Sequence, residues 1–185
     1  MLSAFFLLIQ LGLAIYITYL TIAFFTGAPF VPSSKRTAQA MFELANIKPG
    51  LKVYDLGSGD GRLLFLAARA GASAVGFEIN PFLVIWTRLK ILFSPYRKTI
   101  RVYWKNFWRG NFSDADVIFV YLLPWRMEQL KKMMFDQVKS GTIIVSNSFI
   151  FKEWKIVGQN QTAHVYVFQV PSMKKIATQE LTGGK

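Results

Sequence analysis

Acidic side chains and glycines stand close together in the stretch VYDLGSGDGRLLF, residues 53–65. Gly57, Gly59 and Gly61 allow the backbone to turn sharply and to approach a ligand closely. The acid Asp55 comes at the end of an apolar, strand-like run, immediately before this turn. A carboxylate at this position disfavours a bound phosphate, so the stretch indicates a ligand that carries a cationic group.

The dinucleotide fingerprint G-x-G-x-x-G is the first pattern to compare with this loop. It does not fit, because its third glycine would fall on Arg62 and because Asp55 would repel the pyrophosphate. S-adenosylmethionine, in contrast, is a nucleoside that carries an ammonium group on its methionine part and no phosphate. The pattern D-x-G-x-G therefore favours this methyl donor over NAD.

Polar residues also follow the next two strand-like runs. Glu78 ends the run in VGFEINP, where an acid can accept hydrogen bonds from both ribose hydroxyls. Asn106 follows the run in YWKNFW, so that its amide can pair with the adenine edge while Phe107 stacks on the ring. Ordinary structural roles exist too, as helix N-caps for Asp55 and Asp60 and as a turn residue for Asn106. Three strand ends in this order favour the methyl donor.

Alternating strands and helices would position these side chains. After a helix over residues 36–46, strand-like and helix-like runs alternate up to residue 150, and WKIVGQN and HVYVFQV then suggest an antiparallel hairpin. This order predicts an α/β fold, with a Rossmann-like, mostly parallel sheet of seven strands and helices on both faces. Ligands of such sheets bind beyond the carboxyl ends of the strands. The residues that we expect at this carboxyl edge of the sheet are 55–61, 78–81, 106–108 and 121–125.

The N-terminal residues have a different character. No charged residue stands between Leu2 and Phe25, and a helix of this length would cross a hydrocarbon core of about 30 Å. The run lacks the basic start and the cleavage site of a signal peptide, so we expect a retained transmembrane helix. The first charges after it are Lys35 and Arg36, which predicts a single-pass membrane protein with its C-terminal domain on the cytoplasmic or equivalent side. The expected parts are an anchor (1–26), a linker and lid (27–35), a folded domain (36–172) and a polar tail (173–185).

The charge balance narrows the expected partners. Lys and Arg number 22 against 10 Asp and Glu, a net charge of +12, which favours an anionic partner such as a lipid surface, although a solvated basic surface explains it equally well. Cysteine is absent and His164 is the only histidine, so we expect no metal site and no thiol chemistry. The helix-like run PFLVIWTRLKILF is apolar on most of its circumference, which core packing would ordinarily explain. We also consider that it rests on lipid headgroups, together with a basic and aromatic surface made of Arg97, Lys98, Arg101, Trp104, Lys105, Trp108 and Arg109.

The segments DLGSGDGR and GFEINP, with the late hairpin, resemble those of class I (seven-strand) S-adenosylmethionine-dependent methyltransferases. A narrower likeness rests on PFVPSS (29–34) ahead of YDLGSGDGR and GFEINPFLV. These stretches resemble the protein-lysine methyltransferases of the adenine nucleotide translocase and the ATP synthase c-subunit, and their small archaeal relatives. The resemblance covers roughly residues 29–150.

The resemblance implies methyl transfer to a lysine ε-amine, and it implies the donor-binding residues. Asp55, Gly57, Ser58 and Gly59 would hold the methionine end, Glu78 and Ile79 the ribose, and Asn106 with Phe107 the adenine. Phe30 and Ser33 would belong to a lid over the site. The residues of the substrate channel would be Tyr121, Pro124 and Trp125, with Leu122 and Phe149 completing an apolar wall.

One departure concerns the residues after the fourth strand. Many amino methyltransferases place Asn or Asp, Pro and an aromatic there, whereas this chain has YLLPW (121–125). The change disfavours a planar amine as acceptor and leaves a lysine, which needs deprotonation, desolvation and alignment. The favoured partner is therefore a protein that presents a lysine, possibly in a membrane, with no nucleic acid expected. The alternatives are a lipid amine or another small molecule as acceptor, a non-catalytic module that binds the donor, and an RNA methyltransferase, which the positive charge favours but the residues after the fourth strand and the expected anchor do not.

Overall fold

The computed structural model describes residues 2–26 and 33–171, which contain one sheet of seven strands in the order β3-β2-β1-β4-β5-β7-β6. Strands β1 to β5 are parallel to one another, and β7 lies between β5 and β6 and is antiparallel to both. This confirms the predicted Rossmann-like sheet with its antiparallel hairpin. The strands are β1 (Lys52–Leu56), β2 (Ser73–Glu78), β3 (Ile100–Trp104), β4 (Val117–Val120), β5 (Ile143–Asn147), β6 (Ile156–Asn160) and β7 (Val165–Gln169).

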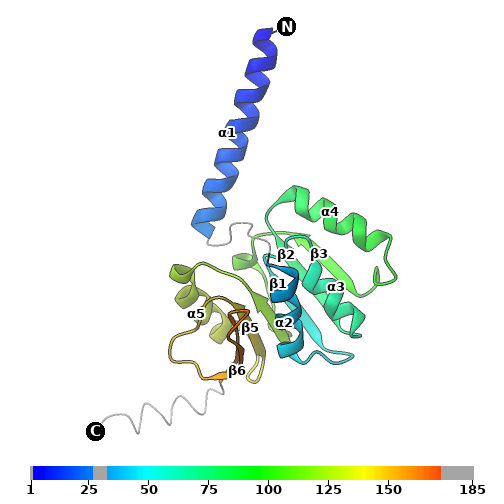
Figure 1. The fold of residues 1–185 in the computed structure, drawn as a ribbon, viewed down its shortest axis with the longest axis vertical. Coiled ribbons are helices and arrows are strands. Elements are labelled where there is room, and N and C mark those ends of the chain that lie inside the picture. Colours follow the sequence, from blue (N-terminus) through cyan, green and yellow to red (C-terminus); the bar gives the residue numbers. More distant parts are fainter. Residues whose placement is uncertain (1, 27–32, 172–185) are drawn as a thin grey trace, which may run out of the picture.

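Helices cover both faces of the sheet, because side chains alternate between the faces along each strand. Val53 of β1 packs in one apolar cluster with α2 (Lys35–Ala45), α3 (Arg62–Arg69) and α4 (Pro81–Leu92). Its neighbour Tyr54 packs in the other cluster, with α5 (Met127–Gln137) and the 3-10 turn η1 (Phe107–Arg109). Figure 1 shows the sheet between these two layers.

Local sequence signals set the starts of two helices. The Ser34 hydroxyl accepts a hydrogen bond from the Thr37 amide at 2.9 Å and so caps α2. Asn80 caps α4 in the same way, through the Phe82 amide, and Pro81 follows as the first helical residue. The helix after Glu78 therefore begins immediately beyond the edge of the sheet where the candidate ligand residues lie.

Strand β4 is shorter than the sequence indicates. The apolar run ADVIFVYLL predicts a strand up to Leu123, but β4 ends at Val120, which pairs with Leu56, the last residue of β1. Beyond this point β1 offers no partner, so Tyr121–Leu123 leave the sheet and lead into the 3-10 turn η2 (Pro124–Arg126). Helix α5 then begins at Met127 rather than at Pro124.

The connection from β3 to β4 contains no α-helix. Residues 105–116 form only the turn η1 and loops. The face of β2 and β3 that lies opposite α3 and α4 is thus left partly uncovered.

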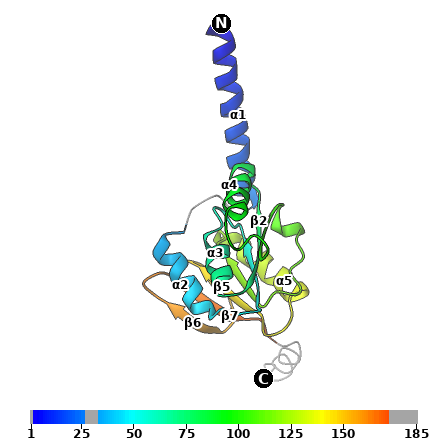
Figure 2. The ribbon, with the colours of Figure 1, turned by 90° about the vertical axis from the view of Figure 1, so that its right-hand side faces the viewer.

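The predicted transmembrane helix over residues 2–25 is not confirmed. Residues Leu2–Thr26 form the helix α1, which extends away from the sheet (Figures 1 and 2), but among the described residues no helix has the length and hydropathy that a membrane span requires. Most of the predicted linker and lid, including Phe30, and the predicted tail lie outside the described residues.

Candidate functional site

The glycine loop follows β1 and is fastened to the end of β2. The amides of Gly57 and Ser58 both donate to the Phe77 carbonyl at 2.9 Å. Gly57 has a φ of +90°, and a Cβ built there would meet no atom within 4 Å. The loop therefore turns in a conformation that favours glycine and leaves open space above Gly57, as a site that accepts a ligand against its backbone requires.

Glu78 ties the glycine loop to the start of α4. Its carboxylate accepts hydrogen bonds from the amides of Gly59 at 2.8 Å, Ile79 at 2.9 Å and Asn80 at 2.8 Å. The side chain is only 6% exposed. Three amide donors compensate for the burial of this acid and hold its carboxylate beside the glycine loop.

Asp55 also lies beside the glycine loop, but no hydrogen-bond donor among the described residues compensates for the burial of its carboxyl group. It is buried at the end of β1, and no described residue donates a hydrogen bond to its carboxyl group. Burial above all, and then the charges of Glu78 and Asp60, raise the pKa of Asp55 to about 8. An ordinary structural carboxylate would be paired, so an unpaired acid at this depth indicates that a cationic group of a ligand completes the site.

Ser58 adds a second unsatisfied group next to Asp55. Its Oγ is buried and has no hydrogen-bond partner among the described residues. Gly76 of β2 makes room for it, because a Cβ at this position would stand 2.6 Å from Ser58 Oγ. A buried carboxyl and a buried hydroxyl, both unpaired, together fit the polar methionine end of the methyl donor better than they fit a structural turn.

Arg62, Lys90 and Asn147, which the sequence did not single out as site residues, frame the loop. Arg62 forms an ion pair with Asp60 at 3.0 Å and also donates to the Ser33 carbonyl. Burial alone would raise the pKa of Asp60, but Arg62 and Lys90 outweigh it and hold the pKa below its usual range. At the end of β5, the amide of Asn147 donates to Ser33 Oγ at 3.1 Å. Ser33, predicted to belong to a lid, is thus held against the glycine loop and the end of β5.

The predicted adenine residues lie at the correct edge but have other partners. Asn106 caps η1, with its Oδ1 accepting from the Trp108 amide at 3.0 Å. Phe107 is 3% exposed and packs in an apolar cluster that also contains Phe77. Their contact with adenine stays a prediction, with the side-chain nitrogen of Asn106 as the group that has no partner among the described residues.

The predicted channel residues lie together beyond β4. Tyr121 is half-buried and stacks against Phe149, with 6.5 Å between the ring centroids. Pro124 and Trp125 form the exposed turn η2, while Leu122 is buried beneath it. The structure therefore places Tyr121, Phe149 and Trp125 at the same edge of the sheet as Asp55, and their role in a substrate channel stays a prediction.

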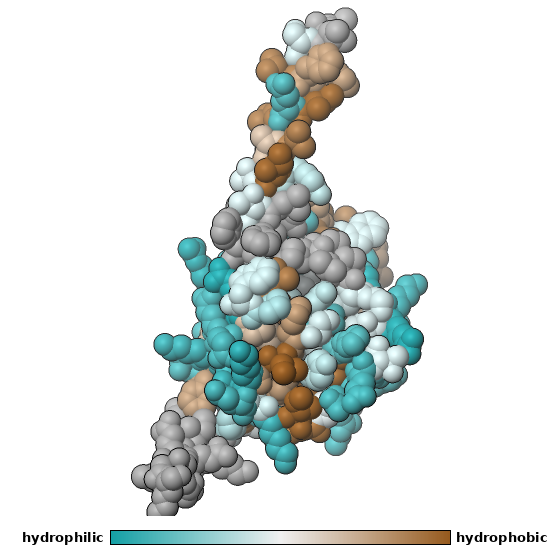
Figure 3. Space-filling model, turned by 60° about the vertical axis from the view of Figure 1, so that its left-hand side comes forward, coloured by the Kyte–Doolittle hydropathy of each residue, from teal (hydrophilic) through white to brown (hydrophobic). Residues whose placement is uncertain are grey.

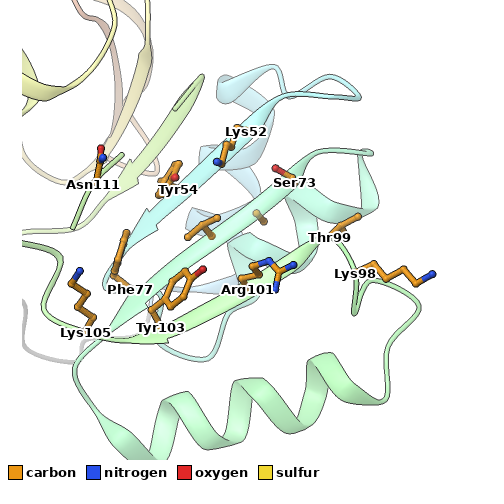
Figure 4. A pocket seen from close by; sticks show the side chains of 12 residues that line it. Lys52, Tyr54, Ser73, Phe77, Lys98, Thr99, Arg101, Tyr103, Lys105 and Asn111 are labelled. Carbon is orange, nitrogen blue, oxygen red and sulfur yellow. The ribbon is translucent and has the colours of Figure 1, made fainter. Parts of the chain in front are cut away.

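A separate groove lies on the uncovered face of β1, β2 and β3. It has a volume of about 480 Å³, and Figure 4 shows Lys98, Arg101, Tyr103 and Lys105 along its outer side. Lys52 at the inner side is paired with Asp114. The absence of a helix between β3 and β4 leaves this groove open.

Gly61 closes the loop onto α4 and offers a stability test. It has a φ of +78°, and a Cβ at this position would stand 2.6 Å from Thr87 Cγ2. The Thr87 side chain is itself fixed, because its hydroxyl donates a hydrogen bond to the Gly59 carbonyl. We expect Gly61→Ala to lower the free energy of unfolding by about 3 kcal/mol, because backbone strain and a steric clash add up. Gly50→Ala is the matched control, since its φ is +85° and its Cβ would meet nothing within 4 Å. Urea unfolding measures both variants, and an equal loss in the two would show that the contact with Thr87 is unimportant.

Comparisons with known proteins agree with this geometry. The family model described as ANTKMT methyltransferase domain matches residues 55–158. The lysine N-methyltransferase of the ATP synthase c-subunit from Rattus norvegicus is 31% identical over 126 residues, which cover 68% of this chain and 58% of that protein. A protein-lysine N-methyltransferase of Saccharolobus islandicus is 30% identical over 154 residues, covering 79% of this chain and 96% of that protein.

Among solved structures, an RNA methyltransferase from Salinibacter ruber in complex with S-adenosyl-L-homocysteine has a TM-score of 0.72. It is 33% identical, and the match covers 77% of this chain and 95% of that one. The family model, the protein relatives and the solved structure therefore agree on a methyltransferase that uses S-adenosylmethionine, while the acceptors in their names differ between protein lysine and RNA.

Proposed function

Because the chain belongs to the family of ANTKMT methyltransferase domains, we propose that it transfers a methyl group from S-adenosylmethionine to the ε-amine of a protein lysine. The family match begins at Asp55 and extends through β5 to Gly158, so it includes the strand ends where the candidate site lies. The single observation that carries the proposal is the buried carboxyl of Asp55, which has no hydrogen-bond donor among the described residues.

The residues at this edge fit the donor group by group. Asp55 and Ser58 would take the amino-acid end, because both are buried polar groups without a partner among the described residues. Glu78 would take the ribose through Oε2, which accepts only from the Gly59 amide and can accept a further hydrogen bond, whereas Oε1 already accepts from Ile79 and Asn80. The donor supplies an already activated methyl group on its sulfonium, so the protein needs mainly to hold and align the acceptor.

The wall after β4 supports a lysine as the acceptor. A lysine amine must lose its proton before it can attack, and an apolar surrounding lowers the pKa of an amine by disfavouring its charge. Tyr121, Phe149 and Trp125 offer such a surrounding without an acidic side chain among them. In this proposal they position and desolvate the amine, and no residue of the wall acts as a general base.

The protein substrate is a separate part of the proposal. The relatives in Rattus norvegicus and Saccharolobus islandicus are named as lysine methyltransferases of a protein, and the first of these is matched over only 58% of its length. RNA is the second candidate acceptor, because the Salinibacter ruber relative is described as an RNA methyltransferase and the open groove carries Lys98, Arg101 and Lys105. The apolar wall lacks the amide or carboxylate that would bind the planar amine of a base, which favours lysine.

Incubation with radiolabelled donor tests the acceptor directly. Separated protein, RNA and lipid fractions are each offered to the enzyme, and amino-acid analysis of the labelled protein identifies methyl-lysine. We expect label in protein as methyl-lysine, and none with Asp55→Asn. Label confined to RNA or to lipid would exclude the lysine proposal, and no label in any fraction would favour a module that only binds the donor.

Two variants of Tyr121 test the apolar wall. We expect Tyr121→Phe to keep kcat/KM within about twofold, because the ring still stacks against Phe149, and Tyr121→Ala to lower it by about tenfold or more. Donor affinity, measured by calorimetry, stays unchanged in both. A large loss in Tyr121→Phe would instead assign a direct role to the hydroxyl group.

A further inference from the structure

Helix α4 exposes an apolar stripe where a surface helix ordinarily presents polar residues. Its buried residues are Val84, Thr87 and Ile91, which follow each other at helical spacing and face the sheet. The opposite side of the helix also follows helical spacing, but with large apolar residues: Phe82, Ile85, Trp86, Leu89, Leu92 and Phe93 just beyond its end. We call these six residues the outer stripe.

The outer stripe is too exposed to belong to the core. Phe82 is 79% exposed, Phe93 is 85% exposed, and Trp104 at the end of β3 adds an indole that is 65% exposed. The Trp104 indole donates its N–H to the Ile79 carbonyl at 3.0 Å and is thereby held against the chain that leads into α4. A contiguous patch of exposed apolar side chains of this kind marks a surface that binds a protein, a membrane or an apolar ligand.

All charged residues in the chain segment that contains the outer stripe are positive. Between Ile79 and Ser113 the chain contains seven Lys and Arg and no Asp or Glu. Arg88 and Lys90 are engaged by backbone carbonyls, whereas Arg97, Lys98, Arg101 and Lys105 are exposed and have no partner among the described residues. Figure 4 shows Lys98, Arg101 and Lys105 on the groove side of the edge strand β3, with α4 beside that strand, so a surface that approaches this edge of the sheet reaches both the cations and α4. This segment thus carries seven of the twelve net positive charges.

Helix α4 also lies toward the end of the domain from which α1 extends, as both ribbon views show (Figures 1 and 2). Helix α1 is itself exposed along its described length, with Leu7 and Leu8 at 65% and 68%, and Figure 3 shows its hydrophobic surface above a domain bordered by hydrophilic side chains. Two exposed apolar helices therefore lie toward the same end of the molecule.

We propose that α4 docks on an anionic lipid surface, with the outer stripe among the headgroups and the free cations of residues 97–105 on the lipid phosphates. Aromatic and apolar residues flanked by Lys and Arg are typical of helices that lie in a membrane interface. Protein interfaces are depleted of Lys, and two copies of a segment with seven positive charges repel each other, so charge complementarity favours lipid over a partner protein. Docking through α4 needs no helix that spans the membrane.

The chain contains no cysteine, so a single label can report on α4 in the full-length protein. Ile85→Cys, labelled with an environment-sensitive fluorophore, is mixed with vesicles of phosphatidylcholine alone or of phosphatidylcholine with phosphatidylglycerol. The matched control is Gln159→Cys, an exposed neutral position on β6. We expect a blue shift and quenching by spin-labelled lipid at Ile85→Cys, at least fivefold stronger in anionic vesicles, and neither effect at Gln159→Cys. Because α4 lies at the end from which α1 extends, binding through α1 alone would also bring Ile85→Cys closer to the lipid than Gln159→Cys, so the variants of Phe82 and Phe93 decide whether α4 itself contacts the lipid.

Two further variants, made in the labelled Ile85→Cys chain, separate the apolar and the ionic contributions. Phe82→Ser with Phe93→Ser should weaken quenching about tenfold in both kinds of vesicle, and both sites are exposed, so the fold is preserved. Arg101→Gln with Lys105→Gln should abolish the preference for anionic vesicles. Equal quenching at Ile85→Cys and Gln159→Cys would overturn the proposal. So would a blue-shifted Ile85→Cys label before lipid is added, together with a dimer in sedimentation, because a second copy would then cover the stripe.

Discussion

Replacement of Asp55 by Asn is expected to weaken binding of S-adenosylmethionine by at least about 100-fold. The carboxyl is buried, and the ammonium of the donor would be the only cation that pairs with it, so the variant leaves that ammonium buried without an opposite charge. Isothermal calorimetry measures the dissociation constant. Asp136→Asn, which removes an exposed acid from α5, is the matched control and should bind normally. Normal binding by Asp55→Asn would show that the donor is held elsewhere.

The pH dependence of binding follows from the same group. Below pH 8 the free protein carries a protonated Asp55, whereas pairing with an ammonium requires the carboxylate. Binding should therefore release about one proton at pH 6.5, and affinity should rise about tenfold per pH unit until it levels off near pH 8. Calorimetry in two buffers that differ in ionisation enthalpy counts the protons, and Asp55→Asn should release none.

The stability of the free protein should change in the opposite sense. The pKa of Asp55 is raised by folding, so the native state binds a proton that the unfolded state has already lost, and stability declines as pH rises from about 4 to about 8. At pH 8 Asp55→Asn should thus be several kcal/mol more stable than the parent, since the pKa is raised from 3.8 to about 8 and each pKa unit corresponds to about 1.4 kcal/mol. A gain in stability with a loss of binding distinguishes a site residue from a structural one.

Replacement of Glu78 by Gln should weaken donor binding by about 10- to 100-fold. The amide retains an oxygen for the amides of Ile79 and Asn80, but its nitrogen cannot accept from Gly59, and the charge that would bind the ribose hydroxyls is lost. The charge of Glu78 also helps to raise the pKa of Asp55, so in Glu78→Gln the pH at which affinity levels off should move below 8.

A donor analogue without the ribose 2′-hydroxyl tests whether Glu78 binds the ribose directly or only supports the glycine loop. The parent protein should bind the analogue about tenfold more weakly than the donor, and Glu78→Gln should bind both alike, because the missing hydrogen bond is then missing in either case. If Glu78 only supported the glycine loop, the penalty for the analogue would persist in the variant.

Much of the site was predictable because its key residues sit at strand ends. A polar residue at the end of a buried strand can be recognised in the sequence because it follows an apolar run. Parallel strands bring their carboxyl ends to one edge of the sheet, independently of the loops that connect them. Asp55 and Glu78 were found in this way, as were the order of the elements and the antiparallel hairpin. The end of β4 was misplaced because pairing with β1, and not the apolarity of Tyr121 and Leu122, determines where that strand stops.

Contacts between distant segments were not predictable. Ser33 meets Asn147 across 114 positions of the chain, and Arg62 reaches back to the carbonyl of Ser33, with no local signal for either contact. Asn106 and Phe107 were placed at the correct edge, but only the fold shows that one caps a turn and the other is packed in an apolar cluster. Side-chain partners of this kind depend on three-dimensional packing, which residue types and spacing do not specify.

The sequence by itself determined the alternation of strands and helices, the sheet edge and the place of Asp55 at that edge, because each depends on local periodicity or on a residue at a strand end. Only the tertiary structure decided that Asp55 is left unpaired among the described residues while Glu78 is satisfied by three amides, since both are acids at the ends of neighbouring strands. It also decided which side of the apolar helix α4 is buried. Val84 and Trp86 are both apolar, but Val84 is buried and Trp86 is exposed because the sheet contacts only one side of the helix.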